Sequence, residues 1–301
     1  MSAPSVGLLG CGPWGRLILR DLVALGAEVY VWSPGAESRE VARHGGARAV
    51  HTEIGHLPHC DGFVLAVSAA HHTTCIEAVA ERGVPVFVEK PMCCNADEAR
   101  RLVEQFGDRL FVMDKWRYHN GVLLLAELAR SGELGSIVGM HTTRIGYADS
   151  HSDADAAWTL APHDLSIALE VFGGVSTLSQ AHGHVDHRSQ VRTLAATFTD
   201  DQARWLTVHV SDRSPIDRRE VHLVGTDGSA LLGGGYADHV HVRRGPHYDQ
   251  RAFTPNMPLE AELSVFLDHL RGGPAPRSSA AEAATSVRLI AEARLAVGAD
   301  R

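Results

Sequence analysis

The chain has 301 residues, enough for one large domain or two ordinary ones, and two is the better expectation. Hydrophobic residues make up 45% and charged residues 21%, a mixture that excludes a disordered or low-complexity chain. The net charge is -8 and no basic run occurs, which excludes the electrostatic footprint of a nucleic-acid or anionic-membrane binder. We therefore expect small-molecule partners.

The first residues show none of the features of an export signal, because they lead into a short apolar run without a charged region or a cleavage site. No apolar stretch approaches the roughly 20 residues needed to cross a bilayer. The five cysteines are odd in number and form no C-x-x-C pair, so reduced thiols are expected. These features predict a cytoplasmic protein without membrane contact.

The first third of the chain alternates short apolar runs with helical patterns. Such alternation predicts βαβ units around a parallel sheet. The segments that carry it are 6–9, 14–25, 28–32, 38–44, 62–67, 74–82, 85–88, 95–106 and 110–113.

Beyond a helical stretch at 121–131, polar and apolar residues alternate over long runs, as in strands that bury one face. A largely antiparallel sheet is expected here. Its strands are predicted at 137–147, 178–184, 191–199, 204–211, 220–224, 230–232 and 239–243, with helices at 162–171, 259–270 and 280–297. Because few helices are available to cover this sheet, we expect a homodimer or homotetramer packed sheet to sheet.

The first motif with chemical meaning is G-x-G-x-x-G at 10–15, which follows a predicted strand and opens a helix. Glycines there permit a tight turn and let backbone amides meet a pyrophosphate at the positive end of the helix. An ordinary glycine turn between strand and helix is the alternative. We assign to cofactor binding the residues Gly10, Gly12, Pro13, Trp14 and Gly15.

The cofactor preference depends on the end of the next strand, where a carboxylate would bind the ribose of NAD. No acid stands there, and the strand ends at Ser33. Ser33, with Arg39 and Arg43 in the following helix, suits a 2′-phosphate, so NADP is favoured over NAD. The alternative is that both arginines simply face solvent.

Lysine is rare in this chain: only Lys90 and Lys115 occur among the 28 basic residues, and the rest are arginine. Unlike arginine, lysine can lose its proton, so a retained lysine suits proton transfer or a compact charge. Lys90 follows an apolar strand and precedes Pro91, which keeps it extended. We expect its ammonium in the crevice where doubly wound sheets bind ligands. The alternative is a surface ion pair at the end of a strand.

These motifs make the sequence similar, almost from end to end, to the Gfo/Idh/MocA family of nicotinamide-dependent oxidoreductases. The markers lie at 10–15, 67–72, 89–91, 131–135 and 158–166. The resemblance implies that Lys90 reaches both the cofactor and the reacting oxygen, and that His72 and Glu89 line the cofactor side of the cleft. Ser68 belongs to the same loop, where it or Ala69 replaces the proline usual in the family.

The resemblance also divides the α/β chain into two domains. Residues 1–117 are expected to form a dinucleotide-binding Rossmann domain. Residues 118–301 are expected to form an α+β domain for substrate binding and oligomerisation, with a large open, mainly antiparallel sheet.

The motif at 158–166 lies at the start of a predicted helix, whose first turn suits Pro162. In the family, the histidine that matches His163 faces the substrate as general acid/base, and a carboxylate one turn earlier commonly assists it. That earlier position is Thr159, which can only hydrogen-bond. Trp158 and Thr159 are therefore assigned to substrate binding, and Lys90 and His163 to catalysis. A helix-capping or core histidine is the alternative for His163.

The segment 113–120 concentrates charge and aromatic residues directly after an apolar strand. Lys115, Trp116 and Tyr118 suit hydrogen bonding to a sugar-like ligand and stacking on it. An equally good alternative for Trp116 is that it seals an interface between the domains. Histidines at 182–187 and 151–155 suggest a metal, but no other element completes a ligand set, so no metal is expected.

Together these features predict an NAD(P)-dependent oxidoreductase that moves a hydride between nicotinamide and a carbinol or ketone carbon of a sugar, sugar nucleotide or cyclitol. Lys90 would polarise the oxygen and His163 would carry the proton. Two alternatives stay open. One is a sensor or regulator that binds the dinucleotide without turnover, and the other is redox-neutral epimerisation or glycoside cleavage with bound NAD.

Overall fold

The computed structural model describes residues 3–148 and 154–299 and divides the chain into two compact units. Unit 1 comprises Met1–Lys115 and Leu259–Ala284, and unit 2 comprises Trp116–Pro258 and Thr285–Arg301. The expected second domain, 118–301, therefore loses one internal segment to unit 1. Each unit contains its own sheet.

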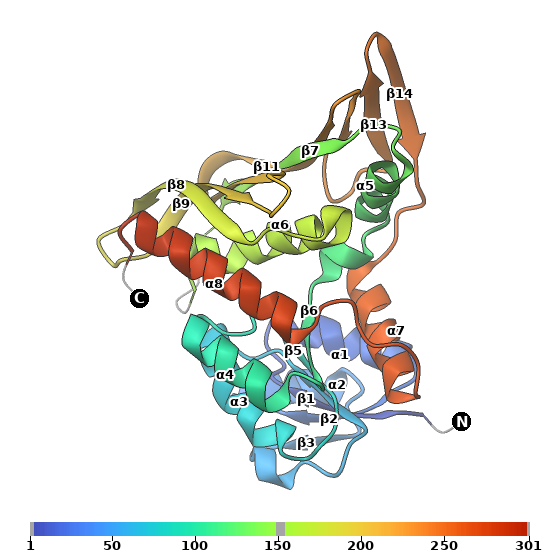
Figure 1. Cartoon of the computed structure of the whole chain (residues 1–301). Helices are drawn as coiled ribbons and strands as arrows, with labels where there is room; N and C mark the ends of the chain where they lie inside the picture. The colour runs from blue at the N-terminus through green and yellow to red at the C-terminus, as the bar shows by residue number, and fades with distance from the viewer. Residues whose placement is uncertain (1–2, 149–153, 300–301) are drawn as a thin grey trace. The chain divides into compact units, whose positions relative to one another are not determined.

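Unit 1 is built on six parallel strands in the order β3-β2-β1-β4-β5-β6 (Figure 1). The strands are β1 (Ser5–Leu9), β2 (Glu28–Trp32), β3 (Ala49–His51), β4 (Gly62–Leu65), β5 (Val86–Glu89) and β6 (Leu110–Met113). All residues of the last three strands are buried, as expected when helices cover both faces of a parallel sheet. The strand order reverses between β1 and β4, the point where such sheets bind ligands at their carboxyl ends. The predicted Rossmann sheet is confirmed.

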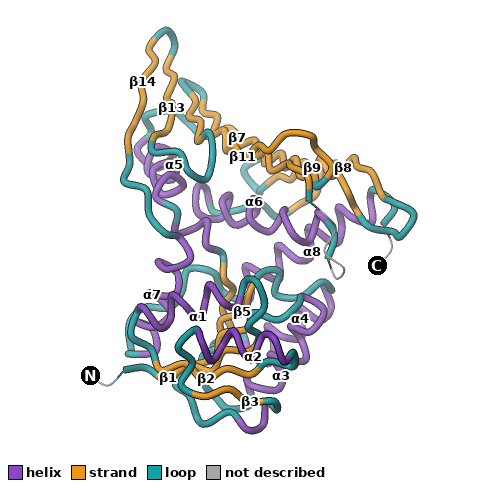
Figure 2. The backbone as a smooth tube through the Cα atoms, turned by 180° about the vertical axis from the view of Figure 1, so that it is seen from behind, coloured by secondary structure: helices purple, strands orange, loops and turns teal. Residues whose placement is uncertain are grey.

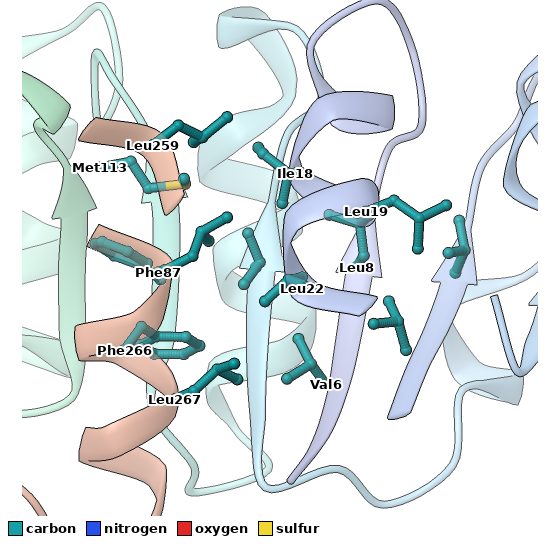
Figure 3. Packing of buried hydrophobic residues seen from close by; sticks show 14 of the residues in the cluster. Val6, Leu8, Ile18, Leu19, Leu22, Phe87, Met113, Leu259, Phe266 and Leu267 are labelled. Atoms are coloured by element: carbon teal, nitrogen blue, oxygen red, sulfur yellow. The ribbon is translucent and has the colours of Figure 1, made fainter. Parts of the chain in front are cut away.

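The helices of unit 1 include one that returns from the far end of the chain. They are α1 (Gly15–Ala24), α2 (Ala36–His44), α3 (His72–Ala80), α4 (Ala96–Phe106) and α7 (Pro258–Leu270), with 3-10 turns η1 (Ile54–His56) and η2 (Ala69–His71). Helix α7 packs on the sheet, where Phe266 stacks on Phe87 with ring centroids 5.0 Å apart (Figure 3). Burying a side chain of this size contributes roughly 1.5–3 kcal/mol, which explains why 259–284 belongs to unit 1.

Unit 2 contains eight strands in the order β14-β13-β12-β11-β7-β10-β9-β8. The strands are β7 (Ile137–Tyr147), β8 (Thr177–Val185), β9 (Val191–Thr199), β10 (Trp205–Ser211), β11 (Arg213–Gly225), β12 (Ser229–Leu232), β13 (His239–Arg244) and β14 (His247–Ala252). Neighbouring strands run antiparallel except β7 and β10, which are parallel. The predicted large, mainly antiparallel sheet is confirmed.

One face of this sheet is packed and the other is more open. Helix α6 (Ala156–Phe172) runs along the sheet and contacts β7, β9 and β10 (Figure 2). Along β7, Met140, Thr142 and Arg144 are buried, whereas His141 points to the opposite face and is exposed. The 3-10 turn η3 (Lys115–Tyr118) and helices α5 (Asn120–Ser131) and α8 (Ala280–Ala296) complete the fold.

Helix α6 begins six residues before the predicted start, so the expectation of Pro162 in its first turn is wrong: Pro162 lies inside the helix. The helix begins earlier because Asp155 caps it: its Oδ1 accepts from Trp158 N at 3.2 Å. A proline in a helix interior lacks the N–H that would bond the preceding turn. The apolar surroundings of α6, which is buried along most of its length, outweigh that loss.

Two strands escaped prediction, and β11 was predicted much too short. Strand β3 has only three residues, and β14 consists largely of exposed polar residues, so neither shows an apolar alternation. Strand β11 extends back to Arg213 through an exposed, charged stretch whose pairing with β7 is irregular between Arg213 and Arg218. None of the helices in the described part of the chain has the length and apolar character of a membrane span.

Candidate functional site

The glycine motif forms the turn from β1 to α1. Gly10 has a φ of +94°, and a Cβ there would lie 2.6 Å from the carbonyl oxygen of Ala66, so only glycine fits. A Cβ on Gly15 would collide with the carbonyl oxygen of Gly10. At Gly12, in contrast, no described heavy atom lies within 4 Å of the Cβ position, which leaves open space at the first turn of α1. This geometry fits a pyrophosphate held by amides at the positive end of a helix.

Trp14, Glu89 and Lys90 come together at the carboxyl end of β5. The indole Nε1 of Trp14 donates to Glu89 Oε1, and Lys90 N donates to Glu89 Oε2 at 3.2 Å. Lys115, the other lysine of the chain, places its Nζ 4.3 Å from the centroid of the Trp14 ring. The glycine motif is thereby joined to the Glu-Lys-Pro motif through one side chain.

A buried carboxyl that the sequence did not point to lies near this group. Glu262 of α7 is fully buried, and neither of its carboxyl oxygens has a hydrogen-bond partner among the described residues. Burial raises the pKa of Glu262 well above its usual value, and the charges of Glu89 and Asp114 raise it further. Burial also raises the pKa of Glu89, which the charge of Lys90 opposes. The carboxyl ends of β5 and β6 therefore hold three acidic groups beside the two lysines.

The loop after β4 is linked to the loop after β5 by a histidine. The ring of His72 is buried, with Nδ1 2.8 Å from the carbonyl oxygen of Pro91 and Nε2 3.1 Å from that of Val67. Ser68 is exposed, and its Oγ lies 2.7 Å from Nδ1 of His71. The structure thus gives His72 a role in holding the two loops together, while direct cofactor contacts of Ser68 and His72 stay predictions.

Arginine is fixed at the end of β2, where the cofactor ribose is expected. Arg39 donates through Nη1 to the carbonyl oxygens of Ser33, at 3.0 Å, and Pro34, at 2.6 Å. Arg43 instead lies at the surface, 3.4 Å from Glu40. Ser33 itself is buried. The structure therefore brings Ser33 and Arg39 together and leaves Arg43 apart from them.

In unit 2, Thr159 and His163 lie one turn apart on α6. Thr159 lines a cavity of about 220 Å³, formed where β7 ends, α6 begins and β10 passes into β11. The Thr159 hydroxyl donates to the carbonyl oxygen of Ala154 at 3.4 Å. His163 is half-buried, and its carbonyl oxygen accepts from Ser166 Oγ at 2.9 Å.

The aromatic residues predicted to hold substrate lie in the interior of unit 2. The guanidinium of Arg144 is 4.6 Å from the centroid of the Trp116 ring, and the ring of His119 is 5.1 Å from it. Trp158 and Tyr118 are buried as well. Contacts on the Trp116 ring agree with a packing role for this residue. Substrate contacts of Lys115, Tyr118 and Trp158 stay predictions.

Buried ion pairs on α6 and its neighbours also escaped prediction. They join Asp164 to Arg144 at 3.1 Å, Asp212 to Arg192 at 2.6 Å, and Asp155 to Arg294 at 2.9 Å. Partners lie up to 139 residues apart in the chain, so no local pattern reveals them.

Metal-binding clusters of three or more His, Cys, Asp or Glu side chains do not occur within 3–148 and 154–299. His182 and His184 are exposed on β8, while most of the other histidine-containing run, 151–155, lies outside the described residues. None of the five cysteines, all of which lie in the described ranges, forms a disulfide, and burial raises the pKa of Cys60, Cys75 and Cys93 to about 11. These three thiols are therefore protonated at neutral pH.

Comparison with known proteins agrees with this geometry. Residues 5–109 match Gfo/Idh/MocA, described as an oxidoreductase family with an NAD-binding Rossmann fold. An inositol 2-dehydrogenase of Burkholderia vietnamiensis is 30% identical over 299 residues, which cover 89% of this chain and 86% of that protein. The myo-inositol dehydrogenase Hyg17 of Streptomyces leeuwenhoekii is 27% identical over 44% of this chain and 43% of its own. The match to this relative and to two other inositol dehydrogenases covers about half of the length of those proteins.

Solved structures share the whole fold at low identity. A levoglucosan dehydrogenase, solved with NADH and levoglucosan, superposes with a TM-score of 0.86 and 17% identity over 98% of this chain and 96% of its own. KijD10, a 3-ketoreductase of Actinomadura kijaniata solved with NADP, gives a TM-score of 0.87 and 17% identity over 98% of both chains. At such identities the likeness concerns the fold alone.

Proposed function

The chain belongs to the Gfo/Idh/MocA oxidoreductase family, and on that premise we propose that it is an NAD(P)-dependent dehydrogenase or reductase. Its substrate is a sugar, sugar nucleotide or cyclitol, which reacts at a carbinol or ketone carbon. One observation carries the proposal: Lys90 is placed beside Glu89 at the carboxyl end of β5, and Trp14 joins that pair to the open turn at Gly12.

The residues of unit 1 divide the work at this edge of the sheet. When bound, the dinucleotide supplies or takes the hydride. The open turn at Gly12 and the first amides of α1 hold its pyrophosphate. The ammonium of Lys90 stabilises the negative charge that develops on the substrate oxygen, a contribution made only in the transition state.

Proton transfer is assigned to His163 on α6. A histidine gives or takes a proton readily near neutral pH, which suits interconversion of a hydroxyl and a carbonyl group. Thr159 stands one turn earlier, at the position where the family commonly carries a carboxylate. Because a threonine hydroxyl carries no charge, it cannot stabilise an imidazolium in the way that a carboxylate does.

NADP is the proposed cofactor rather than NAD. The support is the guanidinium of Arg39, held at the end of β2 by two carbonyl oxygens, and the absence of an acidic residue at 33–36. Arginine binds phosphate oxygens in a fixed fork geometry, whereas a carboxylate at this place would repel a 2′-phosphate.

The proposal is tested with purified protein, both cofactors and a panel of cyclitols, neutral sugars, keto-sugars and nucleotide sugars. Some member of the panel should change the nicotinamide absorbance. Lys90→Ala should lower kcat about 100- to 1000-fold, as expected for loss of one charge-stabilising group. His163→Ala should cost less, because water or Thr159 can carry part of the proton transfer. Arg100→Ala, which removes only an exposed ion pair with Asp97, serves as control.

Thr159 favours a second candidate, a sensor that binds the dinucleotide and a sugar-like ligand without turnover. Such a protein would bind NADP, and the nicotinamide absorbance would stay constant across the panel. Its affinity for the sugar-like ligand would be the same in Lys90→Ala as in wild type. A third candidate is redox-neutral chemistry with bound NAD. Cofactor that stays bound to the protein through purification would distinguish it from the other two.

A further inference from the structure

The cavity beside Thr159 is small and lies wholly within unit 2. Its volume of about 220 Å³ is below the 300–1,000 Å³ of pockets for drug-sized ligands, so it suits one small ring. Five charged side chains line it: Arg144, Asp155, Asp212, Asp217 and Arg219.

Three of these charges already have partners outside the cavity lining. Arg144 pairs with Asp164, and Asp212 with Arg192. Asp155 caps α6 and accepts from Val191 N and from Arg294 Nε. Each of these three residues is buried. They build the walls of the cavity.

Asp217 and Arg219 are different. Both are exposed, and within the described part of the chain neither side chain makes a hydrogen bond or an ion pair. They stand two residues apart on β11, and both line the cavity. The pairing of β11 with β7 is irregular between Arg213 and Arg218, and bulges of this kind re-aim side chains at functional sites.

The facing strand makes room for the aspartate. A Cβ on Gly146 of β7 would collide with Oδ1 of Asp217, so the carboxylate lies directly over the glycine backbone. Gly146 also lines the cavity. The carboxylate is thus seated by the absence of a side chain on the neighbouring strand.

We propose that Asp217 and Arg219 determine substrate specificity by binding two hydroxyl groups of a neutral polyol, the carboxylate as acceptor and the guanidinium as donor. This inference rests on the proposed function and narrows its substrate class. One carboxylate and one guanidinium leave no excess charge, so the cavity selects a neutral ring rather than a phosphorylated one. Asp155 and Asp212 are already paired with arginines, so Asp217 is the carboxylate of the lining that this proposal assigns to the substrate.

The test measures steady-state constants for the neutral polyol that the panel identifies, with myo-inositol and D-glucose as the first probes. Asp217→Asn and Arg219→Gln should each raise KM about tenfold, the effect of losing one hydrogen bond to a charged group, with kcat within about threefold of wild type. Gly146→Ala should also raise KM, because it displaces the carboxylate without changing any charge.

Arg218→Gln is the matched control. Arg218 neighbours Arg219 on β11 and is also exposed, but it pairs with Glu220 at 3.5 Å and does not line the cavity. Its KM should equal that of wild type. Removal of one substrate hydroxyl, as in a deoxy analogue, should weaken binding to wild type and to Arg218→Gln, and should matter less in the variant that has lost the partner of that hydroxyl.

Unchanged KM in both Asp217→Asn and Arg219→Gln overturns the inference while leaving the proposed function intact. So does an equal rise in Arg218→Gln, or a wild-type preference for phosphorylated sugars. If wild type reduces no cofactor, calorimetry with the same polyols decides: weaker binding to the two variants supports the inference although the proposed function fails. Wild-type protein that neither binds nor converts any neutral polyol overturns both.

Discussion

At the scale of single residues, charge is concentrated where β5 and β6 end. Glu89 is the last residue of β5 and Lys90 follows it, and Asp114 and Lys115 follow β6. Trp14 is held between these pairs, donating to Glu89 and lying under Lys115. The position of Lys90 at the carboxyl end of a strand could be predicted from the local sequence motif. The position of Trp14 could not, because it depends on which strands lie side by side.

Cofactor preference can be reversed at Ser33. Ser33→Asp places a carboxylate at the end of β2, where it should repel a 2′-phosphate and accept from a ribose hydroxyl. We expect at least a tenfold weaker affinity for NADP and a tighter one for NAD, measured by fluorescence titration. Ser179→Asp adds the same charge on exposed β8 and should change neither affinity. Unaltered NADP affinity in Ser33→Asp would rule out this assignment.

We expect Glu262 to lower the free energy of unfolding of the protein at neutral and alkaline pH. Its pKa is raised in the folded protein, so between 4.5 and the folded value the unfolded chain loses this proton and the folded one keeps it. Stability therefore falls as pH rises, by about 1.4 kcal/mol per pH unit from this group. Glu262→Gln has no such proton, so its free energy of unfolding relative to wild type should increase with pH.

Urea unfolding at pH 5 and pH 8 measures this difference. Glu260→Gln changes an exposed glutamate on the same helix and should shift stability equally at both pH values. A constant difference between Glu262→Gln and wild type would mean that Glu262 is ionised in the folded protein.

At the scale of elements, the bounds of a strand or helix could be predicted where its apolar residues form a visible pattern. They could not be predicted where a buried helix cap or a run of exposed charged residues sets the bound. Strands β6, β7 and β9 have the predicted bounds, because their alternation or continuous burial is visible in the sequence. The start of α6 was missed because its cap, Asp155, is also held by Arg294, far along the chain. The charged half of β11 was missed because its exposed residues show no periodicity.

Asp155 should be among the most destabilising positions of unit 2. Its carboxylate accepts from Trp158 N, Val191 N and Arg294 Nε, and its side chain is 2% exposed. Asp155→Ala removes the carboxylate that pairs with the largely buried Arg294 and removes a helix cap, for a loss of about 3–5 kcal/mol.

Asn95→Ala is the comparison, since Asn95 only caps α4, accepting from Asp97 N and Glu98 N at the surface. It should cost about 1 kcal/mol. Thermal or urea unfolding that ranks the two variants equally would show that the contacts of Asp155 beyond the cap contribute nothing.

At the scale of the whole molecule, the open face of the eight-stranded sheet remains to be explained. It carries His141 beside Trp205, with ring centroids 4.4 Å apart, and His141 near His222 at 6.2 Å. Partial desolvation lowers the pKa of both histidines, which favours their neutral forms. A sheet face that carries these three rings suits association with a second copy. We expect a homodimer or homotetramer in light scattering at micromolar concentration, and a monomer would contradict this.

The two-sheet architecture was predictable because a change from helix-strand alternation to polar-apolar alternation marks it in the sequence. The return of 259–284 to unit 1 was not, since a helix pattern alone does not say which sheet it covers. Phe266 could stack on any aromatic residue of either sheet, and only the fold selects Phe87.

The central claim is that a hydride passes between the polyol and nicotinamide with Lys90 at the reacting oxygen. It is tested most directly with a polyol deuterated at the carbinol carbon, followed by NMR of the nicotinamide ring. The account predicts deuterium at C4 of the reduced cofactor, appearing about 100- to 1000-fold more slowly with Lys90→Ala. Deuterium that returns to the sugar product, or a polyol that binds while C4 stays unlabelled, would contradict it.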